Sequence, residues 1–219
     1  MVRPLKENAK TKGLWRQDPD RVRRDILNSA VAEFARSGLS GAKIDDISAK
    51  TATSKRMIYY YFGDKEGLYA RALEAAYAKV RDGERKLDLD ALEPRAALEA
   101  LVAFTFDHHR KNPDFIRMVM IENIHHADYL RHSKLIRDLN EGAISRLSDL
   151  IARGTASGDF RADVDATELH WQISALSFFN VSNKPTFSAL FGASVYTREG
   201  QKRLRDRAVA MILGDVLKR

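Results

Sequence analysis

The feature that most constrains the fold is the helical spacing of apolar residues, which recurs along most of the chain. After Pro19, apolar residues return every three or four positions, from Ile26 through Ala30 to Phe34. Similar spacing predicts helices over 43–50, 54–61, 65–85, 94–110, 113–123, 133–156, 165–183 and 197–217. No credible strand run is present, so the sequence predicts an all-α fold.

Local signals mark the ends of the first helices. Asp18 stands before Pro19, which is a typical helix start because a carboxylate accepts from free N–H groups and proline lacks an N–H. Ser54 and Asp64 are expected to cap two later helices in the same way. Gly38 is expected to end the first helix, since glycine readily adopts a positive φ.

Composition excludes several classes of protein. The 219 residues suffice for one or two domains, and the absence of cysteine excludes disulfides and thiolate metal sites. The N-terminus MVRPLKENAKTKGLW lacks the apolar core of a signal peptide, and no apolar run reaches the roughly 20 residues of a membrane span. We therefore expect a cytoplasmic protein without a membrane segment.

The positive charge of the chain is concentrated in its first third. Residues 1–70 carry 14 Lys and Arg against 9 Asp and Glu, which is +5 of the total net charge of +7. Within this part, residues 1–17 are expected to form a flexible basic arm. Such an excess suits a polyanionic partner, although a solvated basic surface would have the same composition.

The stretch TSKRMIYYYFGDKEGLY places three adjacent tyrosines beside basic residues. On a helix with about 100° per residue, Ile58 and Phe62 share one face and are predicted to be buried. Tyr61 lies beside that face, whereas Arg56 and Tyr60 lie nearly opposite. Outward tyrosine hydroxyls can donate to phosphates, and Arg or Lys can donate to guanine O6 and N7. The alternative is that the outer tyrosines pack on the next helix or on a second domain.

The order of helix, short helix, tight turn and third short helix is the helix-turn-helix arrangement. The stretch ILNSAVAEFARSGLSGAKIDDISAKTATSKRMIYYYFGDKEGLY resembles the DNA-binding segment of the tetracycline-repressor (TetR) family of bacterial transcription regulators. The resemblance rests on Ala30, Phe34 and Gly38, on the I.DIS pattern of the second helix, and on SK..IY.YF..KE.L between Ser54 and Leu68.

Two positions depart from the usual pattern of that family. Ala42 and Lys43 stand where a capping threonine is common, and Ala52 and Thr53 stand where Gly-Val is common. Lys43 could still bind a phosphate. Thr53 offers a hydroxyl that valine lacks.

The resemblance implies a role for each residue of this surface. Lys55, Arg56 and Met57 would face base edges. Thr53, Tyr59, Tyr60 and Lys65 would contact phosphates, and Tyr61 is a weaker candidate for the same role. Lys43 and Ser54, which caps the third helix, complete the implied DNA-binding surface.

The resemblance also implies a second domain that binds a small effector and forms a homodimer. The expected division is a helix-turn-helix domain at 18–64, a connecting helix and linker at 65–90, and an effector-binding and dimerisation domain at 91–219. Two apolar-striped segments, 165–183 and 197–217, are candidates for the dimer interface. A symmetric dimer implies a palindromic operator in double-stranded DNA.

The expected effector is a small apolar or aromatic molecule, because such sites combine apolar walls with a few polar anchors. The candidate wall residues are Phe104, Phe115, Met118 and Trp171, and the candidate anchors are His108, Glu122, Asn123 and Asn180. Each of these side chains could instead be ordinary core.

The sequence offers little for catalysis or metal binding. The histidines of the 108–132 region include no pair at i and i+4, and adjacent helical residues diverge by about 100°, so no metal site and no cofactor are expected. GxSxG, P-loop and HExxH motifs are absent. We therefore expect a transcriptional repressor released by its effector rather than an enzyme. A helical-bundle enzyme without a recognisable motif and a ligand-independent DNA-binding protein are the alternatives.

Overall fold

The computed structural model describes residues 18–218, and the expected basic arm at 1–17 lies outside this range. Helices dominate the described residues, in agreement with the predicted all-α class, and a single isolated bridge joins Phe160 to Leu217. The α-helices are α1 (Pro19–Gly41), α2 (Ile44–Lys50), α3 (Lys55–Phe62), α4 (Lys65–Arg85), α5 (Pro94–Lys111), α6 (Pro113–Ile124), α7 (Asp128–His132), α8 (Lys134–Ser157), α9 (Ala166–Ser182), α10 (Lys184–Phe191) and α11 (Arg198–Val216). Two 3-10 turns, η1 (Leu89–Ala91) and η2 (Ser194–Tyr196), complete the set.

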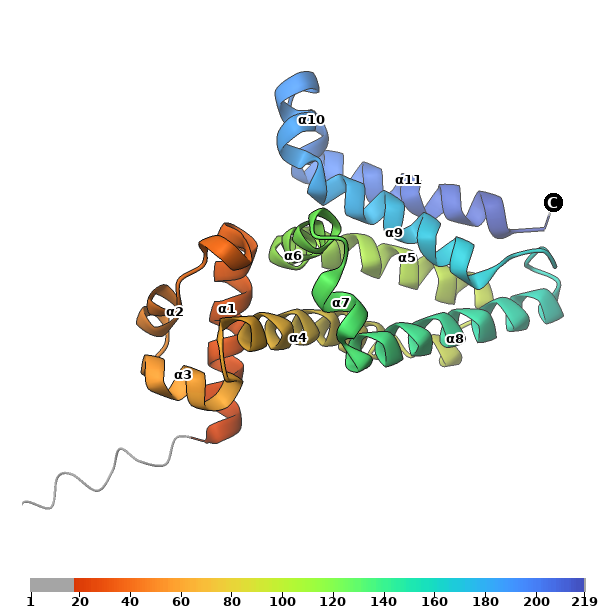
Figure 1. The fold of residues 1–219 in the computed structure, drawn as a ribbon. Helices are drawn as coiled ribbons and strands as arrows, with labels where there is room; N and C mark the ends of the chain where they lie inside the picture. Colours follow the sequence, from red (N-terminus) through yellow and green to blue (C-terminus); the bar gives the residue numbers. More distant parts are fainter. Residues whose placement is uncertain (1–17, 219) are drawn as a thin grey trace, which may run out of the picture.

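Helices α1, α2 and α3 form a small unit at one end of the molecule (Figure 1). The predicted caps are present: Asp18 accepts from the N–H of Asp20, Ser54 from that of Met57, and Asp64 from that of Gly67. Gly38 has a φ of 67°, as a helix end requires, but one further turn follows this kink and carries α1 to Gly41.

Helix α4 leaves the small unit and runs into the larger helical bundle (Figure 1). The apolar core of the small unit contains Phe34, Ile47 and Ile58, together with Leu68 from α4. The same core includes Met118 of α6 and Ile136 of α8. The two parts of the molecule are therefore packed together through a shared apolar core.

The larger bundle is built from α4, α5, α6, α8, α9 and α11. Its main core joins α5, α8, α9 and α11 and includes Phe106, Leu147, Ile173 and Ile212. A smaller cluster around Ile116 links α4 to α6.

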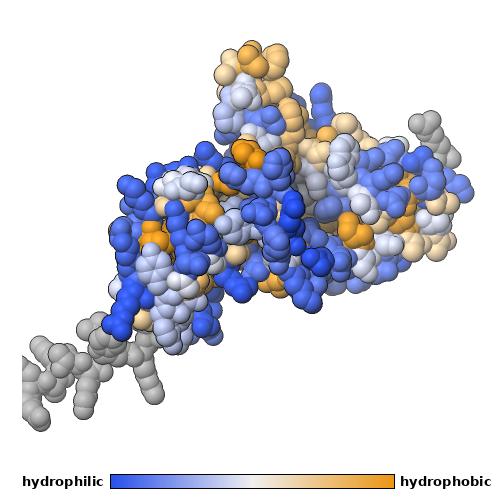
Figure 2. Space-filling view, in the orientation of Figure 1, coloured by the Kyte–Doolittle hydropathy of each residue, from blue (hydrophilic) through white to orange (hydrophobic). Residues whose placement is uncertain are grey.

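Two helices, α7 and α10, were not predicted from the sequence. Both are short and bury no residue, and helices of 5 and 8 residues offer too few turns for an apolar repeat to stand out in the sequence. Helix α7 follows His126 and Ala127, which both have positive φ values. Helix α10 stands off the body, and hydrophobic side chains gather on it in Figure 2.

Exposed apolar side chains cluster on the last three helices. Phe179, Leu190, Phe191 and Met211 are all more than half exposed. Contiguous patches of this kind mark association surfaces in soluble proteins. No helix in the described part of the chain has both the length and the apolarity needed to cross a bilayer.

Candidate nucleic-acid interface and effector pocket

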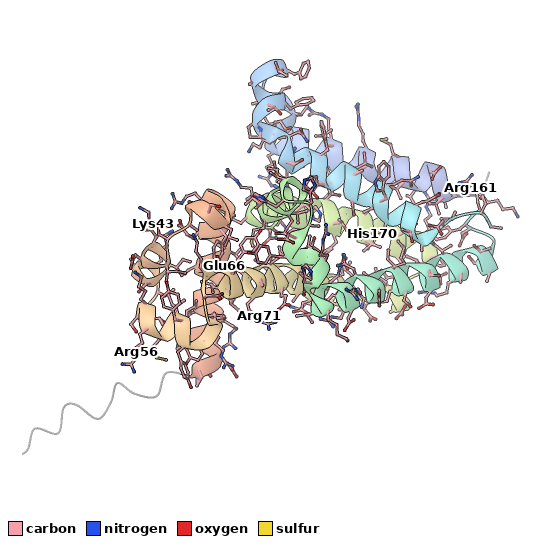
Figure 3. All side chains as sticks on the ribbon, viewed as in Figure 1. Lys43, Arg56, Glu66, Arg71, Arg161 and His170 are labelled. Carbon is pink, nitrogen blue, oxygen red and sulfur yellow. The ribbon has the colours of Figure 1, made fainter. Side chains whose placement is uncertain are left out.

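The recognition helix α3 divides its side chains as the helical spacing predicted. Ile58 is fully buried, whereas Tyr60 is 77% exposed and Tyr59 is 42% exposed. Met57 is also exposed, and Arg56 projects away from the helix unit (Figure 3). The outer face of α3 is thus a basic and aromatic surface open to solvent.

Tyr61 and Thr53, at the two ends of this surface, contact residues of α1 and α2. Tyr61 is half-buried, and the guanidinium of Arg23 lies 5.0 Å from the centre of its ring. In the turn before α3, the carbonyl of Thr53 accepts a hydrogen bond of 2.8 Å from the hydroxyl of Ser48. The hydrogen bond from Ser48 fixes the turn that orients α3 relative to α2, and the contact with Arg23 holds the end of α3 against α1.

The basic candidates differ in their partners. Lys43 is exposed at the start of α2 and forms no capping hydrogen bond there (Figure 3). Lys65 donates from Nζ to the carbonyl of Ser40 at 3.2 Å, which ties the first turn of α4 to the end of α1. Lys55 pairs with Asp45 across the turn.

A buried carboxylate below this surface was missed by the sequence analysis. Glu33 is fully buried in α1 and accepts hydrogen bonds from Arg36 at 2.6 Å and Lys50 at 2.9 Å. The hydrogen bond from Arg36 is the largest cause that lowers the pKa of Glu33 to about 2. Its spacing of three residues from Ala30 and seven from Ile26 was the available signal, because a glutamate on an apolar stripe needs a cationic partner.

A cavity of about 460 Å³ lies between α4, α5, α6, α8 and α9. Of the residues predicted to bind an effector, Phe115, Asn123 and Trp171 line it. Tyr77 and Phe178 add further aromatic wall. Trp171 is 70% exposed and therefore lies at the edge of the cavity rather than inside it.

Three other residues predicted to bind an effector do not line this cavity. Met118 is fully buried in the core shared with the small unit. Phe104 packs over Gly83, where an added Cβ would lie 2.5 Å from its ring. Asn180 exchanges two side-chain hydrogen bonds with Gln201, at 2.9 and 3.0 Å, and lines a different cavity of about 560 Å³ between α5, α9 and α11.

Glu122 does not line this cavity either, and it connects the two parts of the molecule. Its carboxylate is 1% exposed and accepts from the hydroxyl of Tyr69 at 2.8 Å. It also accepts from the backbone N–H groups of Tyr129 and Leu130 at 3.2 and 3.0 Å. This set of bonds, the Glu122 clasp, joins α4, α6 and the start of α7.

The predicted anchor His108 faces a different hollow. It lines a cavity of about 420 Å³ that also involves Asn28 of α1 and Lys79 of α4. The neighbouring His109, which was not predicted, lines the cavity of about 460 Å³ instead. Burial is the main cause that lowers the pKa of His109 to about 3, so this imidazole is neutral at physiological pH.

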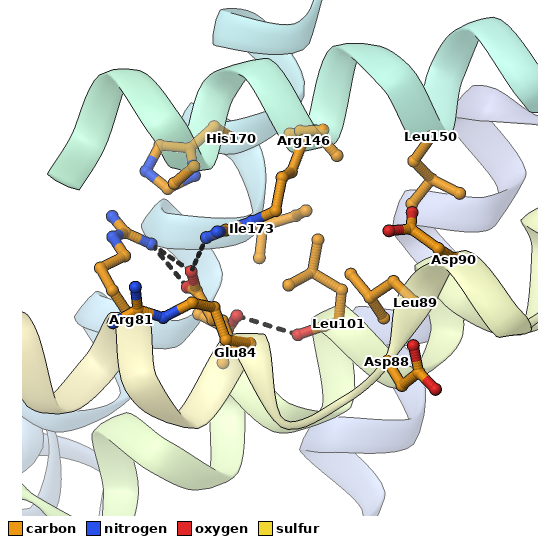
Figure 4. A pocket seen from close by; sticks show the side chains of 14 residues that line it. Arg81, Glu84, Asp88, Leu89, Asp90, Leu101, Arg146, Leu150, His170 and Ile173 are labelled. Carbon is orange, nitrogen blue, oxygen red and sulfur yellow. Dashed lines mark hydrogen bonds and ion pairs between the residues drawn. The ribbon is translucent and has the colours of Figure 1, made fainter. Parts of the chain in front are cut away.

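The sequence analysis also missed the polar wall of the 460 Å³ cavity. Arg81 and Glu84 are both buried and lie 2.5 Å apart, and Arg81 donates to Asn140 at 2.6 Å. Arg146 reaches within 4.0 Å of the same carboxylate. Figure 4 shows Arg81, Glu84, Arg146 and His170 around a second chamber of about 330 Å³, which shares Arg81, Glu84 and His170 with the first. Among residues 18–218, the buried Nε of Arg81 and Nδ1 of His109 find no hydrogen-bond partner.

The described residues contain no group of three His, Cys, Asp or Glu placed to hold a metal ion. The helix-turn-helix unit presents a basic and aromatic face, and the attached bundle contains a cavity with a mixed polar and aromatic wall. This combination is that of a helix-turn-helix DNA-binding regulator with an attached helical bundle.

Comparisons with known proteins agree with this class. Residues 26–72 match the family described as "Bacterial regulatory proteins, tetR family", and residues 94–212 match "Tetracyclin repressor-like, C-terminal domain". The HTH-type transcriptional repressor NicS of Pseudomonas putida is 36% identical over 189 residues, which cover 86% of this chain and 89% of NicS. The chain therefore belongs to the TetR family and is a helix-turn-helix transcriptional regulator.

Solved structures share the fold. The ketosteroid transcriptional regulator KstR2 of Mycobacterium tuberculosis has a TM-score of 0.66 at 21% identity, covering 93% of this chain and 98% of that chain. A transcriptional regulator from Saccharomonospora viridis in complex with choline has a TM-score of 0.67 at 23% identity, covering 91% and 100% of the two chains. TetR-family regulators bind DNA and small-molecule effectors and act as dimers.

Proposed function

We propose that this chain is a dimeric repressor that leaves a palindromic operator when a small molecule enters the cavity between α4 and α9. The observation that carries the proposal is the connection between cavity and helix-turn-helix unit. Asn123 lines the cavity, and its neighbour Glu122 holds Tyr69 of α4. Helix α4 continues directly from the recognition unit, so a shift of α6 would be transmitted to α3.

The DNA-binding face is proposed to work through two kinds of contact. Lys55, Arg56 and Met57 lie at the start of α3, where a recognition helix contacts base edges. The surrounding hydroxyl and amino groups are proposed to hold phosphates and to set the orientation on the duplex. These groups belong to Lys43, Thr53, Ser54, Tyr59, Tyr60 and Lys65, with Tyr61 more restricted by its contact with Arg23.

The effector is proposed to have an aromatic or apolar body and a hydrogen-bonding head. Phe115, Tyr77 and Phe178 would contact the body. The unpartnered nitrogens of Arg81 and His109 would bind the head, since buried polar groups need hydrogen-bond partners. We propose no catalytic role, no cofactor and no metal for this chain, and action in the cytoplasm, where its DNA lies.

The domains are proposed to divide at the boundaries expected from the sequence, with DNA binding at 18–64, the connection at 65–90, and effector binding and dimerisation at 91–219. The dimer is proposed to form through 165–217. The exposed apolar side chains Phe179 and Met211 support this surface.

A binding assay with a labelled operator duplex tests the proposed release. Small aromatic and aliphatic compounds are first screened by thermal shift, and stabilising compounds are then added to the protein–operator complex in a fluorescence anisotropy titration. Release by a compound whose effect is lost in Phe115→Ala, but kept in Phe104→Ala, is the expected result. Stabilising compounds that leave the complex intact would refute effector-controlled release, because a ligand shifts an equilibrium only by its differential affinity.

A further inference from the structure

One lysine of the DNA-facing surface is held by a carboxylate of the neighbouring helix. The Nζ of Lys55 lies 2.7 Å from Oδ1 of Asp45 and donates to Oδ2 at 2.8 Å. Asp45 lies in the first turn of α2, and Lys55 is the first residue of α3, so the pair bridges the turn of the helix-turn-helix. The hydrogen bond to Asp45 is the main cause that raises the pKa of Lys55, which therefore stays charged.

Other basic groups of the same unit are arranged differently. Within the described residues, Lys43 and Arg56 form no ion pair, and Arg56 projects freely (Figure 3). Arg36 and Lys50 are tied to the buried Glu33 below the surface. Lys55 is the DNA-facing cation whose partner, Asp45, is itself exposed at the interface, with 70% of its side chain accessible.

A carboxylate beside a lysine changes what that lysine can bind. An ammonium group has three N–H donors, and the carboxylate of Asp45 leaves at least one of them free. A phosphate placed at the free donor would lie within about 5 Å of the carboxylate, and the two anions would repel each other. Guanine O6 and N7 are uncharged acceptors, so a base edge at the same donor meets no such repulsion.

We propose that Asp45 is a specificity-determining residue that keeps Lys55 from binding phosphates and directs its free N–H to a base edge. Asp45 acts through Lys55 and is therefore a positioning residue. The ion pair also restrains a flexible side chain before DNA arrives, which lowers the ordering cost of a base contact. The inference rests on the proposed DNA-facing role of Lys55.

The test compares two duplexes, one selected by the wild-type protein from a random library and the other a scrambled version of it. Asp45→Asn is expected to raise affinity for the scrambled duplex by about three- to tenfold near 0.1 M salt, because Lys55 gains a phosphate. The slope of log K against log salt on that duplex should steepen by about 0.9. Affinity for the selected duplex should change by less than about twofold, so the ratio of the two affinities falls.

The matched control is Asp46→Asn, which removes an acid from the same turn of α2 but leaves the Lys55 pair intact. Asp46 lies 3.8 Å from Arg36 instead. This variant should raise affinity for both duplexes to the same small extent. In a Lys55→Met background, Asp45→Asn should no longer steepen the salt slope. Circular dichroism verifies that each variant is folded.

Three results would overturn the assignment. Asp45→Asn could raise affinity for both duplexes equally, or Asp46→Asn could lower the specificity ratio as Asp45→Asn is expected to do. The steeper salt slope of Asp45→Asn could also persist in the Lys55→Met background. Lys55→Met alone tests the underlying function, since it should weaken the selected duplex more than the scrambled one. If Lys55→Met has this effect and Asp45→Asn does not lower specificity, only the role of Asp45 is wrong. If Lys55→Met affects neither duplex, the DNA-facing role of Lys55 and the inference fail together.

Discussion

The Glu122 clasp predicts a specific cost for removing one hydroxyl group. In Tyr69→Phe, the ring keeps its edge contacts with Phe34 and Tyr129, at centroid distances of 5.1 and 4.9 Å. Only the 2.8 Å hydrogen bond to Glu122 is lost. A hydrogen bond to a charged group contributes roughly 1.5–3 kcal/mol, and both groups here are about 1% exposed, so water cannot replace the hydroxyl.

The expected loss of stability follows from this arrangement. Glu122 keeps its two backbone donors, so the cost should stay near the value of one charged hydrogen bond rather than that of an unpaired buried carboxylate. For a chain of this size, the melting temperature should fall by on the order of 5 °C. The assay is thermal unfolding monitored by circular dichroism at one fixed protein concentration, because the melting temperature of a dimer depends on concentration.

Tyr129→Phe provides the matched control. Its ring packs against Tyr69, but its hydroxyl makes no hydrogen bond to any residue of the described range. We expect this variant to unfold within about 0.5 kcal/mol of the wild type. Equal stability losses in the two variants would refute the reasoning, because the loss could then not be assigned to the bond with Glu122.

Three further predictions concern the DNA-facing surface, the effector cavity and the last helix. Arg56→Ala should cost about 1–3 kcal/mol on the selected duplex and little on a scrambled one, as measured by fluorescence anisotropy; equal losses would make Arg56 a phosphate contact. His109 has a folded pKa of about 3 against an ordinary value of 6.5, so the unfolded chain takes up a proton that the folded chain excludes. The free energy of unfolding should therefore fall as the pH drops below 6.5, by about 2 kcal/mol at pH 5. Urea unfolding of His109→Phe should show a correspondingly smaller loss between pH 7 and pH 5, and a loss equal to that of the wild type would contradict the prediction. Met211→Glu, at an exposed position of α11, should shift the protein from dimer to monomer in sedimentation velocity, whereas Leu135→Glu, on α8, should not; a dimer in both would place the interface elsewhere.

The sequence was most informative where structure depends on local spacing. The burial of Ile58 and the exposure of Tyr60 follow from the 100° rotation per residue, and both were predicted. The caps at Ser54 and Asp64 depend on hydrogen bonds to N–H groups three residues ahead, and both are present. Such features need no knowledge of distant segments.

The sequence was least informative where partners lie far apart along the chain. Tyr69 and Glu122 are separated by 53 positions, and Arg81 and Asn140 by 59, so neither contact leaves a periodic pattern. Met118 and Phe115 are both large apolar residues of the same helix, so the sequence pattern does not distinguish them. Only the packing of α6 against α1 and α4 decides that Met118 joins the core and Phe115 the cavity.

The central claim is that a symmetric dimer reads DNA through the outer face of α3, and selection from a random library of duplexes tests it most directly. Purified wild-type protein is taken through repeated rounds of binding, and the retained duplexes are sequenced. The account predicts convergence on an inverted repeat, because two copies related by a two-fold axis contact two half-sites of opposite orientation. An Arg56→Ala variant should give a weaker consensus at one base pair of each half-site. Absence of any consensus, or convergence on a single site without an inverted copy, would contradict the account.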